Sequence, residues 1–207
     1  MIFYKESYFF NTSDTPLIID CGANIGLSNL YFSKLHPNSK IISFEADPAI
    51  YEICKKNLIS QNITNVELIN EAVSISNSYQ SFYSKTGDDG SLSEIIGATS
   101  IDVKTKRLRD VLANQKKVHY LKIDIEGAET EVILDIKDQL MKVENLFIDF
   151  HSMINLQKQS LAKILSCLDE LNFWYRITPE YELKGSERKH WNQTYLSYSI
   201  IARKNIV

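Results

Sequence analysis

The sequence predicts an α/β domain built on a mostly parallel sheet whose last strand is antiparallel. Short runs of β-branched and aromatic residues alternate with longer segments whose apolar residues recur every three or four positions, which is typical of strands joined by crossover helices. The last two apolar runs have no helix between them, so they should pair antiparallel. A length of 207 residues suits one domain with a buried core, and we expect that domain to span 1–207.

Each expected strand is a short apolar run. The five parallel strands are expected at 17–20, 41–45, 66–70, 120–124 and 146–150. The closing antiparallel pair is expected at 173–177 and 195–202. Between 79 and 102 the pattern changes to short polar and aromatic runs, and we expect short strands or an irregular insertion there.

The helices are recognised by apolar residues three or four positions apart. The first helix should stop before Pro37, and it is predicted from the spacing of Leu27, Leu30, Tyr31 and Leu35. The second should have Asp47 as its N-cap and Pro48 at its first position, where the missing N–H costs nothing. Further helices are expected at 108–114, 128–140 and 161–171.

Composition narrows the class of protein. Lys and Arg number 23 against 26 Asp and Glu, so the formal net charge is −3, and 44% of the residues are hydrophobic. These values are ordinary for a globular chain and lack the basic footprint of a duplex-binding domain, which argues against nucleic acid as a partner. The three cysteines, Cys21, Cys54 and Cys167, form no C-x-x-C pair, so neither a disulfide framework nor a zinc site is indicated.

The same features predict the location. The first residues lack the basic and apolar regions of a secretory signal, and no window approaches the ~18 apolar residues of a membrane span. Scattered cysteines fit a reducing compartment. We therefore expect a soluble, cytoplasmic protein with no membrane span. The sequence makes no prediction about its oligomeric state.

Ligands of open parallel sheets bind beyond the carboxyl ends of the strands. The segment Asp20-Cys-Gly-Ala-Asn-Ile-Gly26 leaves a strand and enters a helix, so Gly22 and Gly26 would allow a ligand to approach the backbone. It departs from the dinucleotide pattern G-x-G-x-x-G, and a carboxylate at Asp20 would repel a phosphate, which favours a ligand with a positive amino group. The same glycines would also suit a strand–turn–helix corner that binds nothing.

Glu45 ends the second expected strand, roughly where nucleotide-binding sheets place the acid that accepts both hydrogens of a ribose diol. A carboxylate capping the next helix is the alternative, but Asp47 is better placed for that. Together, Asp20 and Glu45 indicate an adenosine ligand without a 5′-phosphate. S-adenosylmethionine is the obvious candidate.

Three motifs, in this order and spacing, resemble the FkbM-type S-adenosylmethionine-dependent methyltransferases: Asp20 to Gly26, Phe44-Glu-Ala-Asp-Pro48, and Leu121-Lys-Ile-Asp-Ile-Glu-Gly-Ala-Glu129. The resemblance covers roughly Leu17 to Phe150. It implies a Rossmann-like class I methyltransferase fold, with a mostly parallel seven-stranded sheet and an antiparallel last strand. It also implies S-adenosylmethionine as cofactor, and the residues expected around it are Asp20, Gly22, Ala23, Asn24, Gly26, Glu45, Ala46 and Asp124.

Many members of the family modify hydroxyls on sugars or on glycosylated natural products. The resemblance therefore implies O-methylation of a sugar, a glycan or a glycosylated small molecule. Little chain precedes the first expected strand, so most of any N-terminal segment that covers the substrate in longer members is expected to be absent. Two other functions stay open: a nucleotide-dependent oxidoreductase on a similar sheet, and a non-catalytic partner protein with a methyltransferase fold.

Asp124 and His151 are the expected catalytic residues. The sulfonium methyl is already activated, so the enzyme must align an acceptor oxygen and remove its proton. His151, directly after the fifth strand, would be the best proton acceptor near neutral pH, and Asp149 on the same face could orient it. A helix N-cap for Asp124 and a hydrogen-bonded surface histidine are the structural alternatives. In a second interpretation, Asp124, Glu126 and His151 hold a divalent metal that lowers the pKa of the acceptor hydroxyl.

Substrate contacts are expected from a long loop between the last two strands. Residues 178–193 mix aromatic and basic side chains, which suit stacking on a sugar and pairing with phosphate. The candidate substrate residues are Glu126, Tyr181, Arg188 and Trp191. The charged run Lys184 to His190 would equally fit a solvated loop.

Overall fold

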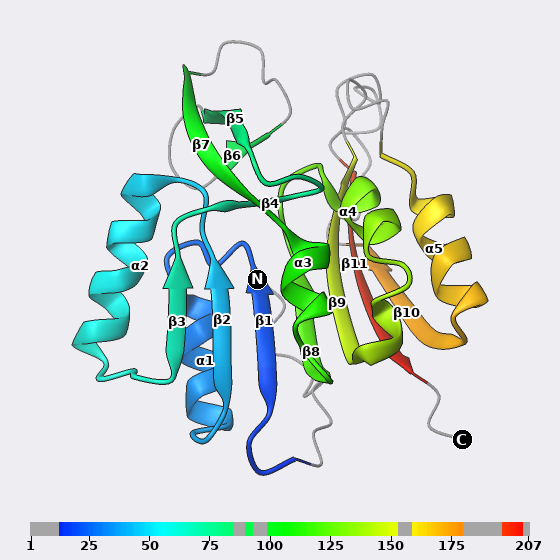
Figure 1. The fold of residues 1–207 in the computed structure, drawn as a ribbon, viewed down its shortest axis with the longest axis horizontal. Helices are drawn as coiled ribbons and strands as arrows, with labels where there is room; N and C mark the ends of the chain where they lie inside the picture. Colours follow the sequence, from blue (N-terminus) through cyan, green and yellow to red (C-terminus); the bar gives the residue numbers. More distant parts are fainter. Residues whose placement is uncertain (1–12, 85–89, 93–98, 153–158, 180–195, 205–207) are drawn as a thin grey trace, which may run out of the picture.

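A computed structural model of the protein describes residues 13–84, 90–92, 99–152, 159–179 and 196–204. Its central sheet has seven strands in the order β10-β11-β9-β8-β1-β2-β3 (Figure 1). Their bounds are β1 Leu17–Cys21, β2 Lys40–Phe44, β3 Val66–Ile69, β8 Val118–Ile123, β9 Val143–Ser152, β10 Phe173–Pro179 and β11 Leu196–Lys204. Strand β11 runs antiparallel to both of its neighbours, and it lies between β9 and β10 rather than at the edge of the sheet. The predicted sheet, with its antiparallel last strand, is confirmed.

Helices cover both faces of this sheet. Their bounds are α1 Leu27–Leu35, α2 Pro48–Ser60, α3 Leu108–Ala113, α4 Glu129–Asp135 and α5 Leu161–Glu170. On one face Phe32 of α1 packs against Ile18 and Phe147, whereas α3 and α4 lie on the opposite face (Figure 1). The main core on that second face includes buried residues of α3, α4 and α5, among them Leu112, Ile133 and Ile164. Among the described residues, no helix combines the length and the apolar character needed to cross a membrane.

Helix α1 ends before Pro37, as predicted, but only two of the four residues whose spacing predicts it, Leu30 and Tyr31, pack against the core. Leu27 and Leu35 are 37% and 45% exposed. The buried positions of this helix are Ser28, Asn29, Phe32 and Ser33. Two of the polar side chains on this face bond to polar groups of the sheet below. The Ser28 hydroxyl donates to the Asp20 carboxylate, and Asn29 Oδ1 accepts from the Ser43 hydroxyl. Apolar periodicity cannot detect such a face.

Two other boundaries differ from those expected. Helix α4 ends at Asp135 and is followed by a separate 3₁₀ helix at Leu140–Lys142, although Ile136 and Leu140 are buried as expected. Strand β9 runs to Ser152, so His151 lies inside the strand instead of directly after it. There it pairs with Ser197 of β11, because the neighbouring strand extends the ladder beyond the apolar run.

A second sheet lies above the carboxyl ends of β1, β2 and β3 (Figure 1). It consists of β4 Ala72–Ser74, β5 Tyr79–Ser84, β6 Gly90–Ser91 and β7 Thr99–Arg107, in the order β4-β7-β5-β6. The short strands expected between 79 and 102 are confirmed. Strand β4 was missed because three residues are too few to show a period. The sheet is inserted between β3 and α3, where it can close a site at the strand ends.

Candidate active site

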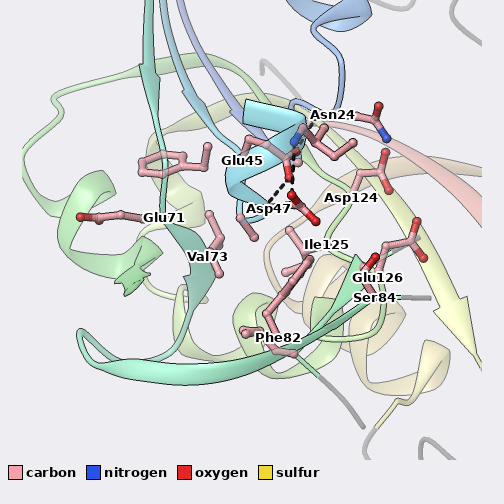
Figure 2. A pocket seen from close by; sticks show the side chains of 17 residues that line it. Asn24, Glu45, Asp47, Glu71, Val73, Phe82, Ser84, Asp124, Ile125 and Glu126 are labelled. Atoms are coloured by element: carbon pink, nitrogen blue, oxygen red, sulfur yellow. Dashed lines mark hydrogen bonds between the residues drawn. The ribbon is translucent and has the colours of Figure 1, made fainter. Parts of the chain in front are cut away.

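A cavity lies between the carboxyl ends of the central strands and the second sheet (Figure 2). From the strand ends, Gly22, Asn24, Glu45 and Ala46 line it, and from the second sheet Phe82 lies across it. Its acidic lining residues are Asp47, Glu71, Asp124 and Glu126. The cavity is therefore apolar on the side of the second sheet and acidic at the strand ends.

The turn after β1 is fixed by its contact with the end of β8. Gly22 has φ +91°, and a Cβ there would lie 1.9 Å from the carbonyl oxygen of Asp124. The N–H groups of Gly22 and Ala23 donate to the Phe44 carbonyl at 3.0 and 2.9 Å. The turn is thus bonded to β2 and pressed against β8. Of the predicted cofactor residues, Ala23 and Gly26 shape this turn without lining the cavity.

Glu45 follows β2 and points into the cavity. Its Oε2 accepts the N–H of Asn24 at 2.7 Å, and its Oε1 accepts the N–H of Asp47 at 2.9 Å. Burial raises the pKa of the Glu45 carboxyl, and the two N–H donors partly oppose that rise. Asp47 caps α2 by accepting from Ala49 and Ile50, which confirms the predicted cap. Each Glu45 oxygen keeps lone-pair capacity for a further donor in the cavity.

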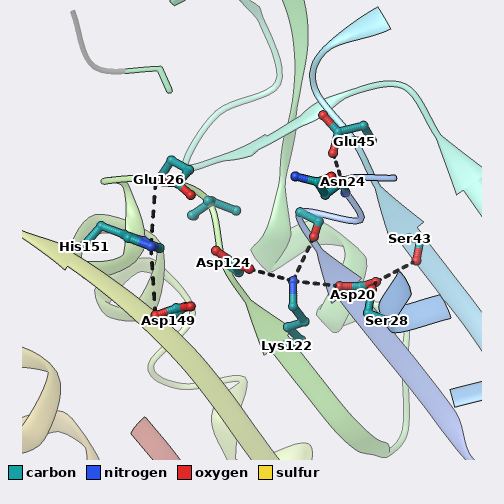
Figure 3. A network of polar contacts seen from close by, with 12 residues as sticks. Asp20, Asn24, Ser28, Ser43, Glu45, Lys122, Asp124, Glu126, Asp149 and His151 are labelled. Carbon is teal, nitrogen blue, oxygen red and sulfur yellow. Dashed lines mark hydrogen bonds and ion pairs between the residues drawn. The ribbon is translucent and has the colours of Figure 1, made fainter. Parts of the chain in front are cut away.

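Lys122 is a charged residue of the site that sequence reasoning did not assign a role. It is 2% exposed, and its Nζ lies 3.3 Å from Asp20 Oδ1 and 3.1 Å from Asp124 Oδ2 (Figure 3). It also donates to the Gly22 carbonyl at 2.8 Å. Burial alone would lower the pKa of Lys122, but the charges of Asp124 and Asp20 outweigh it and raise that pKa. The sequence signal that could have identified Lys122 as a site residue is a lysine inside an otherwise apolar strand.

The position of Asp20 corrects one expectation. Its carboxylate is 0% exposed and does not line the cavity. It accepts from Ser28 and pairs with Lys122, so it faces the interior of the protein and not a bound cation. Sequence order places an acid at the strand end but does not say on which side of the turn the carboxylate lies.

His151 is buried behind Glu126. Its Nδ1 lies 3.3 Å from Glu129 Oε1, and its Nε2 lies 3.7 Å from Glu126 Oε2 and 3.9 Å from Asp149 Oδ1 (Figure 3). The expectation that Asp149 shares its face is confirmed. The ring therefore lies among three carboxylates from β9, α4 and the segment between β8 and α4.

These carboxylates decide the protonation of His151. Burial by itself would lower the pKa of the imidazole, but the hydrogen bond with Glu129 and the charges of Glu126, Glu129 and Asp149 raise it to about 10. An imidazole that already carries its proton at neutral pH cannot accept another. These surroundings therefore favour Asp124 over His151 as the acceptor of the substrate proton, and both assignments stay predictions.

Asp124, Glu126 and His151 come together as one metal-ligating group. Their ligand atoms all lie within 4.8 Å of one another. Glu126 has φ +53° and Gly127 has φ +105°, so the chain turns sharply before α4, and the Glu126 carbonyl accepts from Ser91 at 2.5 Å. This arrangement could hold a divalent cation at the edge of the cavity.

Other predicted site residues have different outcomes. Glu126 lines the cavity, as its predicted substrate role requires. Tyr181, Arg188 and Trp191 lie outside the described residues. Cys21 is buried, and burial raises the pKa of its thiol, as expected for a packing residue.

This fold is the fold of known methyltransferases. The crystal structure of Methyltransferase FkbM from Methylobacillus flagellatus KT superposes with a TM-score of 0.59 at 15% identity, covering 95% of this chain and 46% of that chain. The precorrin-6y C5,15-methyltransferase of Geobacter metallireducens gives a TM-score of 0.54 at 14% identity, covering 96% and 85%. This chain therefore spans about half the length of the solved FkbM protein.

Sequence comparison gives the family. The Methyltransferase FkbM domain matches residues 20–175, so the chain belongs to the FkbM methyltransferase family, as its motifs indicated. Methyltransferase sdnD of Sordaria araneosa is 29% identical over 66% of this chain and 68% of its own. Methyltransferase 1 of Beauveria bassiana is 27% identical over 93% and 82%. The 2-O-methyltransferase NoeI of Sinorhizobium fredii is 26% identical over 65% and 63%. Methyl transfer is accordingly the class of activity.

Proposed function

We propose that the protein transfers the methyl group of S-adenosylmethionine to a hydroxyl oxygen of a sugar, a glycan or a glycosylated small molecule. One observation carries this proposal. A single cavity has the carboxylate of Glu45 beside the turn of Asn24, and the carboxylates of Asp124 and Glu126 at the end of β8. Glu45 and the turn of Asn24 suit the nucleoside of the cofactor. Asp124 and Glu126 suit the end of the cavity where the methyl group is transferred.

The cofactor would use groups already positioned for it. Glu45 accepts the ribose hydroxyls, and Ala46 and Ile50 provide apolar contact near the purine. Gly22 allows the methionine portion to approach the backbone, while Asp124 accepts from its ammonium group. Asp20 acts indirectly, because it holds Lys122 beneath the turn.

The transfer itself needs alignment and loss of one proton. The acceptor oxygen attacks the methyl carbon, the carbon–sulfur bond breaks, and its electron pair stays on sulfur, which yields S-adenosylhomocysteine. The hydroxyl proton leaves the oxygen, and without a cation we assign its acceptance to Asp124. The name of the relative NoeI, a 2-O-methyltransferase, supports a hydroxyl acceptor.

Two other functions are less well supported. A dinucleotide cofactor needs a turn that accommodates pyrophosphate, but here Asn24 occupies the position of the second glycine, and the carboxylates of Asp124 and Glu126 adjoin the turn. A non-catalytic partner protein would have no need for a cavity lined by ionisable groups. Both functions predict ligand binding that differs from that of a methyltransferase.

Calorimetric titration with S-adenosylhomocysteine and with NAD tests the proposal. We expect S-adenosylhomocysteine alone to bind, and Glu45→Gln to weaken its binding. Glu67→Gln is the matched control, because Glu67 is exposed in an ion pair with Lys40. Binding of NAD alone would indicate an oxidoreductase, and binding of neither would indicate a partner protein.

A further inference from the structure

We infer that Asp124, Glu126 and His151 form a binding site for one divalent cation of the Mg²⁺ or Mn²⁺ type, which holds the acceptor oxygen. The inference rests on the proposed function, since it assigns this site to the acceptor end of the same cavity. Asp124 and Glu126 line the cavity, and His151 lies directly behind Glu126. A cation between them would therefore be open to a substrate.

The separations fit a single ion. The three ligand atoms lie within 4.8 Å of one another, and His151 Nε2 is 3.7 Å from Glu126 Oε2. Bonds of about 2.1 Å to Mg²⁺ place opposite ligands ~4.2 Å apart, and bonds of about 2.4 Å to Ca²⁺ place them ~4.8 Å apart. Neighbouring ligands of an octahedral Mg²⁺ lie ~3.0 Å apart, so the ligand atoms of His151 and Glu126 need to approach each other by roughly 0.7 Å to hold the ion.

The orientation of His151 is a second observation, independent of the acidic cluster. Glu129, which is fully buried at the start of α4, lies against Nδ1 and also accepts the N–H of Gly127 at 2.9 Å. Nε2 is thereby aimed at Glu126 and the cavity edge (Figure 3). A histidine that ligates a metal through one nitrogen usually has a carboxylate on the other, which fixes the ring.

The presence of a histidine among the ligands favours a metal ion, and not the cationic cofactor, as the group that binds to Asp124 and Glu126. Carboxylates alone would suit the sulfonium and ammonium groups of S-adenosylmethionine equally well. An imidazole nitrogen ligates a divalent metal once the metal has displaced its proton, whereas a cationic cofactor gains nothing from a protonated imidazole. Lys122 Nζ lies 3.1 Å from Oδ2 of Asp124, and the lone pairs of the two carboxylate oxygens allow Asp124 a further partner.

The cation would change how the acceptor is activated. A hydroxyl that ligates a divalent ion becomes more acidic. Its proton is then lost to a water molecule, the oxygen attacks the methyl carbon, and the electron pair of the broken carbon–sulfur bond remains on sulfur. With the cation bound, Asp124 acts as a ligand rather than as a base.

Binding of Mn²⁺ to the full chain, followed by the electron paramagnetic resonance of free Mn²⁺, tests the site. We expect one Mn²⁺ per chain, and both Glu126→Gln and His151→Gln should weaken binding at least ~10-fold, since even an outer-shell partner of a metal is worth that much. Glu67→Gln is the control and should bind as the wild type does. Glu126 is partly exposed, so its variant should fold even where His151→Gln does not.

Absence of Mn²⁺ binding to folded protein at millimolar concentration would overturn the inference, as would a Glu126→Gln variant that binds Mn²⁺ like the wild type. Titration with S-adenosylhomocysteine in the presence of EDTA tests binding of the cofactor product independently of the cation. If that ligand binds and Mn²⁺ does not, only the cation site fails. If Mn²⁺ binds and S-adenosylhomocysteine does not, the cofactor assignment fails and the cation site stands.

Discussion

Replacing Lys122 by Met removes the one cation from a buried group of opposite charges. Asp20 is 0% exposed and would lose its partner, while the Gly22 carbonyl would lose its donor at 2.8 Å. Breaking a buried ion pair by removing one partner costs about 3–5 kcal/mol. At ~2–4 °C per kcal/mol for a chain of this size, we expect Tm to fall by ~6–20 °C.

Urea denaturation followed by circular dichroism measures this cost, with Lys55→Met as the matched control. Lys55 pairs with Glu52 at 3.8 Å, and both side chains are more than half exposed, so the control should lose less than ~0.5 kcal/mol. The double variant with Asp20→Asn should lose less stability than the sum of its single variants, by ~0.5–3 kcal/mol, because the uncompensated charge is gone. Strict additivity, or a Lys122→Met variant as stable as the control, would refute the reasoning.

Three further predictions concern the turn and two titrating groups. Gly22→Ala should lower Tm and abolish binding of S-adenosylhomocysteine by calorimetry, because its Cβ would overlap the Asp124 carbonyl oxygen at 1.9 Å; an unchanged affinity would contradict this. The affinity for S-adenosylhomocysteine should fall on acidification through the raised pKa of Glu45, at a higher pH than for an ordinary glutamate, and Glu45→Gln should remove that pH dependence. In metal-free protein, the imidazole NMR signals of His151 should stay those of the protonated ring until about pH 10, whereas His36, whose pKa burial lowers, should titrate below its usual range. Titration of His151 near neutral pH would show that its carboxylate partners are absent.

The sheet could be predicted from the sequence because most residues of its central strands are apolar, although single polar residues such as Lys122 interrupt the runs. Strands β1, β2, β8 and β9 are buried on both faces, so their composition alone identifies them. Helix α1 was predicted in its place, but its polar buried positions were not, because Ser28 and Asn29 are buried by hydrogen bonds to the sheet and not by apolar packing. The period of the apolar residues identifies a buried face only where the buried side chains are themselves apolar.

The candidate site was predicted in position but not in electrostatics. The polar residues at the strand ends could be found because parallel strands bring their carboxyl ends to one edge. The partners of Lys122 and His151 could not, because they come from separate elements: Asp20 from β1, and Glu129 from α4. Which carboxylate neutralises which cation depends on side-chain direction, and that determines whether His151 can act as a base.

Transfer of a labelled methyl group tests the central claim most directly. The protein, supplied with Mn²⁺ and S-adenosylmethionine labelled in its methyl group, is incubated with a panel of nucleotide sugars, oligosaccharides and glycosylated small molecules. We predict that label appears on a hydroxyl oxygen of one acceptor class, with one S-adenosylhomocysteine formed per methyl transferred. Label on nitrogen or carbon, or no transfer to any acceptor by protein that binds S-adenosylhomocysteine, would contradict the account.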